Sequence, residues 1–197
     1  TYDKTVTPGH PTEVDDVVEA IAYIRANADR LGVDPNRIGC WGNSAGGNLC
    51  ALAAVRGDVN PDVVVSFSGP MDLPLTHAQA NGRKPAQVLE DYLGSTPTEN
   101  PALWADASPV THVTADAPEM FLVESLRDST AGTPAFSQLL TDAGVNNVLI
   151  QPERGHARSL YTQRYPELLG QAFDWLDARF AEEPPPTTTT TLPGCDE

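Results

Sequence analysis

The sequence predicts a single α/β domain built on a doubly wound, mostly parallel sheet. Short continuous runs rich in Val, Ile and Leu alternate along the chain with segments of helical periodicity, a pattern typical of parallel strands joined by crossover helices. Because the apolar runs are continuous, we expect helices to cover both faces of the sheet. The length of 197 residues and the hydrophobic fraction of 40% fit one globular domain with a substantial core.

The first expected helix covers residues 13–31. Apolar side chains recur there at helical spacing, and charged side chains occupy the outward positions. Thr12 is placed to cap this helix and Gly32 to end it.

The next elements are a strand at residues 37–41, a glycine-rich turn at 42–47 and a helix of small residues that starts at Ser44 and extends to residue 56. Further apolar runs predict strands at 63–67, 120–124 and 148–151. Helices are expected between and after them at about 86–93, 134–143 and 166–180. The domain then covers residues 1–181.

The composition excludes several classes of partner. The chain has 12 Lys and Arg against 27 Asp and Glu, a formal net charge of −15. Since an acidic surface repels phosphate groups, neither nucleic acid nor an anionic membrane surface is an expected partner. No stretch approaches the roughly 18 consecutive apolar residues of a membrane span. The sequence gives no indication of an oligomeric state.

Residues 182–197 are rich in Pro and Thr and lack apolar periodicity, so they predict a disordered tail. Thr-rich tails resemble the O-glycosylated stalks of exported proteins, which favours an extracellular or cell-surface location. A disordered end of a cytoplasmic protein is the alternative. The three cysteines, Cys40, Cys50 and Cys195, cannot all pair within one chain and leave both locations open.

Residues 42–46 match the G-x-S-x-G pattern between a predicted strand and a predicted helix. Gly42 and Gly46 keep this tight turn free of side chains. The turn places the Ser44 hydroxyl at the carboxyl end of the sheet, where the backbone N–H of Ala45 can donate to an oxyanion. Ser44 is therefore the candidate nucleophile. The alternative is a glycine-rich turn in which the serine has no catalytic role.

A serine nucleophile needs a base and an acid, which follow it in the order Ser, acid, His on this kind of sheet. His156 lies just after the last predicted strand and is the candidate base, whereas His10, His77 and His112 are expected to be ordinary surface histidines. Asp128, four residues after the strand 120–124, is the preferred acid.

Asp72 competes with Asp128 for the role of the acid, with capping of a turn as its alternative role. Arg127, next to Asp128, is expected to be a solvated or pairing charge. Cys40 and Cys50 have no nearby His, so we expect no metal site. The chemistry of a Ser, His and Asp triad needs no cofactor.

Residues 31–39, followed by Trp-Gly-Asn-Ser-Ala-Gly-Gly-Asn-Leu at 41–49, resemble the nucleophile region of α/β-hydrolase esterases. The resemblance is to hormone-sensitive-lipase-like carboxylesterases and to the feruloyl/acetyl-xylan esterase-like (BD-FAE) family. The segments 91–94 and 107–113 favour the second family. There the following strand usually leads into His-Gly-x-x-Asp, of which residues 124–128 keep only Asp128.

The resemblance implies an α/β-hydrolase fold of which this chain forms the C-terminal two-thirds. The strand and His-Gly-Gly loop that precede the first helix in these families have no counterpart upstream of residue 11. We therefore expect a fold that is incomplete at its N-terminal side.

The implied activity is serine carboxylic-ester hydrolysis through an acyl-enzyme. The expected substrates are short-chain or aryl esters, including esters linked to polysaccharide. Two other hypotheses stay open: a non-catalytic or fragmentary hydrolase-like binding protein, and a serine peptidase of the prolyl-oligopeptidase type.

Overall fold

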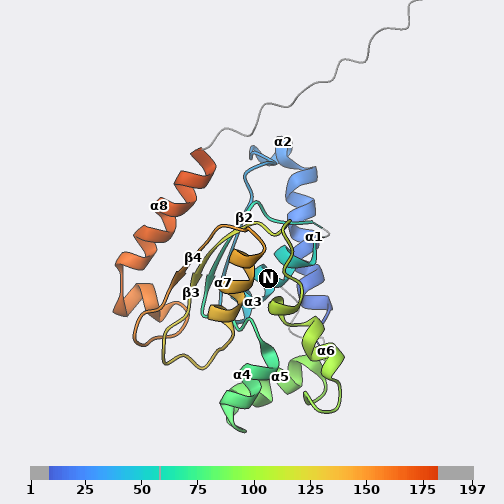
Figure 1. The fold of residues 1–197 in the computed structure, drawn as a ribbon. Helices are drawn as coiled ribbons and strands as arrows, with labels where there is room; N and C mark the ends of the chain where they lie inside the picture. The colour runs from blue at the N-terminus through green and yellow to red at the C-terminus, as the bar shows by residue number, and fades with distance from the viewer. Residues whose placement is uncertain (1–8, 58, 182–197) are drawn as a thin grey trace, which may run out of the picture.

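The computed structural model describes residues 9–57 and 59–181 and contains one four-stranded parallel sheet in the order β1-β2-β3-β4 (Figure 1). The strands are β1 (Gly39–Asn43), β2 (Val63–Phe67), β3 (Glu119–Val123) and β4 (Asn147–Ile150). Each strand pairs in parallel with the next one along the chain. The parallel sheet predicted from the sequence is confirmed.

Helices cover both faces of this sheet. The helices of these layers are α1 (Thr12–Ala26), α3 (Ala45–Arg56), α7 (Thr133–Asp142) and α8 (Glu167–Ala181). Helices α3 and α7 pack on one face, and α1 packs outside α3. Helix α8 covers the other face (Figure 1). This arrangement confirms the doubly wound layer.

The strand side chains divide between two apolar clusters. Val64 and Met120 face α3 and α7, where they meet Phe136 among others. The neighbouring Val63 and Val65 contribute to the opposite cluster under α8. Because alternate residues of a strand point to opposite faces, a continuous run of valines fills both layers.

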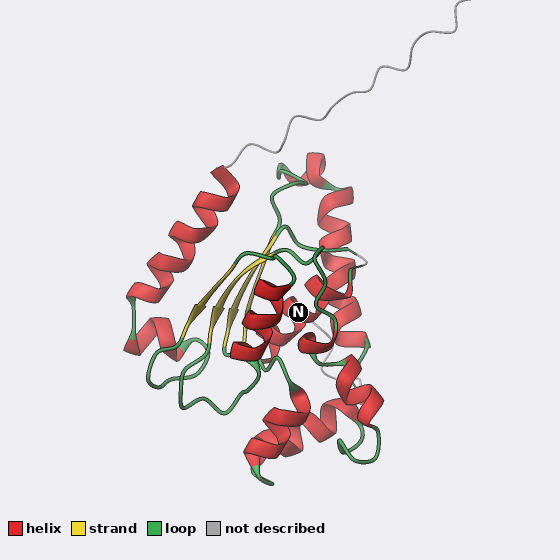
Figure 2. Cartoon of the chain, viewed as in Figure 1, coloured by secondary structure: helices red, strands yellow, loops and turns green. Residues whose placement is uncertain are grey.

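Three helices form a small group beyond the carboxyl ends of the strands (Figure 2): α4 (Leu73–Ala80), α5 (Lys84–Leu93) and α6 (Pro101–Asp106). They share an apolar cluster centred on the buried Trp104. The shorter elements are α2 (Ala28–Leu31), a 3₁₀ turn at Pro109–Thr111 and a π-helical turn at Leu160–Arg164.

The first predicted helix is wrong in two details. It breaks at Asn27, whose side-chain amide donates a 2.8 Å hydrogen bond to the carbonyl of Tyr23 and whose backbone is not helical. Thr12 is the first helical residue, and Pro11 occupies the cap position instead. The end at Gly32 is confirmed by its left-handed φ of 68°.

The strand predicted at 37–41 lies two residues further on, and the other predicted strands and helices agree within two residues. Within the described part of the chain, no helix combines the length and the apolarity that crossing a bilayer requires. The predicted tail at 182–197 lies outside the described residues.

Candidate active site

The turn between β1 and α3 holds Ser44 in a conformation that side chains rarely adopt, with φ 53° and ψ −122°. Such backbone strain costs on the order of 1–3 kcal/mol and persists where the surrounding structure enforces it. A side chain at Gly42 would collide with the carbonyl of Gly46. The turn therefore requires glycine at position 42.

The expected need for glycine at position 46 is wrong. A Cβ added to Gly46 would meet no atom within 4 Å, because this position faces open space. The close approach of α3 occurs one residue later instead. There, a Cβ on Gly47 would lie 2.5 Å from Ser66 Oγ and 3.0 Å from the Cα of Gly69.

A disulfide joins Cys40 of β1 to Cys50 of α3. The bond links the strand before Ser44 to the helix after it, so it clamps both arms of the turn. The number of cysteines alone did not determine which of them pair.

Three predicted residues meet at the carboxyl end of the sheet. His156 Nε2 lies 3.0 Å from Ser44 Oγ, and His156 Nδ1 lies 2.6 Å from Asp128 Oδ1. Because an ionised carboxylate only accepts hydrogen bonds, Nδ1 carries the ring proton and Nε2 can accept from the Ser44 hydroxyl. The three side chains come from the loops after β1, β3 and β4 and form one relay.

Asp128 is held by several donors in a buried position, with 1% of its side chain exposed. Besides His156, its oxygens accept from Ser68 Oγ at 2.6 Å and from the backbone N–H of Ser129 at 2.7 Å. Burial acts to raise the pKa of Asp128, but the hydrogen bonds from His156 and Ser68 outweigh it and hold this pKa below the usual value. Asp128 therefore stays ionised.

Ser68 is the site residue that the sequence analysis missed. It is fully buried, and its hydroxyl donates to Asp128 Oδ2 while accepting from the backbone N–H of Ala157 at 2.9 Å. The signal was its place directly after β2, at the same sheet edge as Ser44. Ser68 ties the loop of the acid to the loop of His156.

Asp72 takes the capping role. Its side chain accepts from the backbone N–H of Leu75 at 2.8 Å and so caps α4. Arg127 is an exposed pairing charge, 3.6 Å from Glu153.

His10 is buried, so its expected surface position is wrong. Its Nε2 lies 2.8 Å from Asp106 Oδ2, and its ring packs edge-on against Tyr92. An ion pair or hydrogen bond to a carboxylate lets a histidine sit in the interior. His77 and His112 make hydrogen bonds within the group of helices α4 to α6 and the turn after it.

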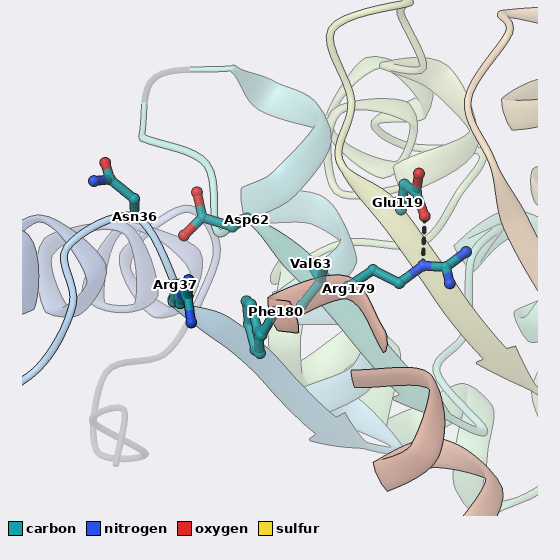
Figure 3. A pocket seen from close by; sticks show the side chains of 7 residues that line it. All are labelled: Asn36, Arg37, Asp62, Val63, Glu119, Arg179 and Phe180. Atoms are coloured by element: carbon teal, nitrogen blue, oxygen red, sulfur yellow. Dashed lines mark hydrogen bonds and ion pairs between the residues drawn. The ribbon is translucent and has the colours of Figure 1, made fainter. Parts of the chain in front are cut away.

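A pocket of about 230 Å³ lies at the opposite end of the sheet, where β2 and β3 begin (Figure 3). Arg179 donates there to Glu119 Oε2 at 2.7 Å, and Arg37 pairs with Asp34 at 3.2 Å. Each arginine already has a carboxylate partner, so these charges hold the α8 end and the turn before β1 in place. Among the residues that the structure describes, no group of three or more His, Cys, Asp or Glu could hold a metal ion.

The chain is similar in sequence to known esterases. It is 33% identical over 161 residues to Esterase LipQ of Mycobacterium tuberculosis, a match that covers 75% of this chain and 38% of LipQ. The chain thus spans little more than a third of the length of this curated relative.

Solved structures show the same fold. The acetyl ester-xyloside bifunctional hydrolase from Caldicellulosiruptor lactoaceticus superposes with a TM-score of 0.76 at 24% identity, covering 92% of this chain and 70% of that one. The α/β hydrolase MGS-M1 from a deep-sea metagenome gives a TM-score of 0.65 at 21% identity, covering 88% of this chain and 66% of that one.

The family model BD-FAE matches residues 2–142, which include both Ser44 and Asp128. Together with the four parallel strands and the turn at Ser44, this match identifies the fold as that of the α/β hydrolases. The chain belongs to the BD-FAE family.

Proposed function

We propose that this chain carries the catalytic centre of a serine carboxylic-ester hydrolase. The observation that supports the proposal best is the hydrogen-bonded relay from Ser44 Oγ through His156 to Asp128, at 3.0 Å and 2.6 Å. A strained serine at the start of a helix, with a base in hydrogen-bond reach and a buried acid behind it, is the arrangement that activates a hydroxyl.

In the proposed reaction, Ser44 Oγ attacks the ester carbonyl while its proton moves to His156 Nε2. The tetrahedral intermediate collapses as the C–O bond to the alcohol breaks, and His156 returns the proton to the leaving alkoxide. Water then attacks the acyl-enzyme with His156 again as the base. This second half releases the carboxylic acid and restores the Ser44 hydroxyl.

Two features would stabilise the charges that develop during these steps. The ionised Asp128 faces the imidazolium that forms on His156 and keeps the ring in the required tautomer. The backbone N–H of Ala45 lies in the first turn of α3, where helix N–H groups have no partner within the helix. We assign it as an oxyanion donor, and loss of one such donor costs on the order of 10²–10³ in rate.

For the substrate, we infer short-chain or aryl esters, including acyl groups attached to polysaccharide. The similarity to LipQ supports an ester, and the similarity to a hydrolase of acetyl esters and xylosides supports a carbohydrate-linked acetyl group. The net charge of −15 favours neutral over anionic esters.

The test is hydrolysis of p-nitrophenyl acetate, p-nitrophenyl butyrate and acetylated xylan by the chain and by Ser44→Ala and His156→Ala. Both variants should lose turnover while keeping the circular dichroism spectrum of the parent. Ser137→Ala, on α7 outside the site, is the matched control and should retain turnover. Hydrolysis that persists in Ser44→Ala would reject the serine mechanism.

We also propose that the protein works in an oxidising compartment outside the cytoplasm. The Cys40–Cys50 disulfide supports this location, because disulfides persist in exported proteins and are rare in reducing cytosol. Cell fractionation under thiol-blocking conditions tests it. A chain found in the cytoplasm with all cysteines reduced would contradict the proposal.

A further inference from the structure

Glu124 is a buried acid that the proposed reaction does not use. It is the first residue after β3, and only 5% of it is exposed. Its backbone N–H donates to the carbonyl of Ile150, but its side-chain oxygen Oε1 is buried and has no hydrogen-bond partner among the described residues. An ionised carboxylate is very costly in such a place, whereas a neutral carboxylic acid is tolerated.

The surroundings of Glu124 contain one other carboxylate. A pocket of about 330 Å³ lies between α4, α7 and the loop after β3, and Glu124 and Asp128 are the two ionisable residues that line it. Leu75 and Gln79 of α4 and Gln151, the residue after β4, also line the pocket, and all three are uncharged.

The other charged groups near this pocket already have hydrogen-bond partners. Asp72 precedes α4 and caps it, and His156 donates its Nδ1 proton to Asp128. No cation among the pocket-lining residues balances a second negative charge beside Asp128.

Two carboxylates in one buried space do not both ionise without a large cost. Asp128 has His156, Ser68 and a backbone N–H as donors, so it takes the charge. Burial, in first place, and the negative charge of Asp128 raise the pKa of Glu124 to about 7.

We propose that Glu124 is a positioning residue for the triad acid: it stays protonated beside the ionised Asp128, and loss of its proton pushes Asp128 away from His156. The inference rests on the proposed function, since it assigns Asp128 the role of orienting His156. Glu124 borders the pocket and 5% of it is exposed, which allows its proton to exchange with solvent. Activity then declines as the solution becomes alkaline, for a reason separate from the chemistry of Ser44.

The first test is the rate of labelling by a fluorophosphonate between about pH 5.5 and about pH 9, a range that spans the raised pKa. The parent chain, Glu124→Gln and Glu119→Gln are compared, each normalised to its own rate at the acid end. Gln keeps the size of the neutral acid and cannot ionise. Glu119→Gln removes a carboxylate from the opposite end of the same strand and is the matched control.

The second test does not depend on activity. The low-field proton NMR signal of the His156 ring N–H that donates to Asp128 reports this hydrogen bond directly. Its shift is followed over the same pH range in the same three proteins.

If the inference is right, the parent and Glu119→Gln lose labelling by up to about tenfold per pH unit above the midpoint, and their low-field signal shifts or vanishes with the same midpoint. Glu124→Gln then shows neither change. A profile of Glu124→Gln that follows the parent in both measurements overturns the inference. A third outcome separates the two proposals: none of the three proteins is labelled, yet the His156 NMR signal depends on pH in the parent and not in Glu124→Gln. That outcome supports the inference about Glu124 and rejects the proposed function.

Discussion

The hydroxyl of Ser68 donates a 2.6 Å hydrogen bond to Asp128 and accepts a 2.9 Å hydrogen bond from the backbone of Ala157, next to His156. One buried side chain, directly after β2, thus fixes both the acid and the loop of the base. The positive φ of 56° at Ser68 shows that the chain bends sharply there to place it.

Ser68→Ala should lower kcat for p-nitrophenyl butyrate by about 10- to 100-fold, since hydrogen bonds to charged groups contribute about 1.5–3 kcal/mol. Ser66→Ala is the matched control: Ser66 is also buried on β2, but its hydroxyl has no hydrogen-bond partner among the described residues. The kcat of Ser66→Ala should stay within about twofold of the parent value. Equal effects of the two changes would show that Ser68 contributes only packing.

Asp128→Asn should lower kcat by about 10³- to 10⁴-fold, because an amide cannot hold the imidazolium of His156 in the required tautomer. Asp72→Asn should leave kcat nearly unchanged, since Asn also caps helices well. Steady-state kinetics on both variants decide between the two acids. A comparable loss from Asp72→Asn would contradict the assignment of Asp128.

The stability of the chain should decrease between about pH 4.5 and pH 7 because of Glu124. The pKa of its folded state is raised from 4.5 to about 7, so its contribution is fully present below pH 4.5 and is lost as the pH rises through 7. The total change is about 3 kcal/mol in the free energy of unfolding.

Urea unfolding of the parent and of Glu124→Gln at several pH values measures this dependence. The variant should show a flatter profile over that interval. The lowered pKa of Asp128 acts in the opposite sense, as its contribution is present above its usual pKa and is lost as the pH falls. A parent whose stability is constant from pH 5 to pH 8 would count against a protonated Glu124.

Reduction of the Cys40–Cys50 disulfide should lower the free energy of unfolding by about 2–3 kcal/mol, the amount expected for a closed loop of about ten residues. Under denaturing conditions, one thiol per chain should react with a thiol reagent before reduction, and three should react after reduction. The double change Cys40→Ala, Cys50→Ala should show the same loss of stability without reductant. Three reactive thiols before reduction would exclude the disulfide.

The two flanking glycines of the Ser44 turn should respond differently to alanine. Gly42→Ala places a Cβ against the carbonyl of Gly46 and should lower Tm strongly or prevent folding. Gly46→Ala adds a Cβ in open space and should keep the Tm of the parent. Thermal unfolding followed by circular dichroism compares them, and equal tolerance of both changes would mean that the turn differs from the one described.

Local patterns predicted the sheet and the relay well. The strand of valines at 63–67 and the turn around Ser44 are specified by neighbouring residues, so the sequence shows them directly. His156 and Asp128 could be found because each lies just after a strand, and the carboxyl ends of parallel strands meet at one edge.

Features that depend on tertiary contacts could not be predicted in this way. Ser68 also lies just after a strand, but its role follows from contacts with residues 60 and 89 positions away. His10 is buried because α6 supplies Asp106, 96 positions along the chain. The break at Asn27 reflects a side-chain hydrogen bond that competes with the helix, which helical periodicity does not reveal.

The most direct test of the central claim is to trap the acyl-enzyme. The chain is mixed with p-nitrophenyl butyrate, quenched with acid within the first turnover and analysed by mass spectrometry of its peptides. If Ser44 is the nucleophile, one butyryl group is found on the peptide that contains Ser44, and none in Ser44→Ala. A folded chain that releases p-nitrophenol without acylating Ser44, or that acylates another residue equally in Ser44→Ala, would contradict the central claim.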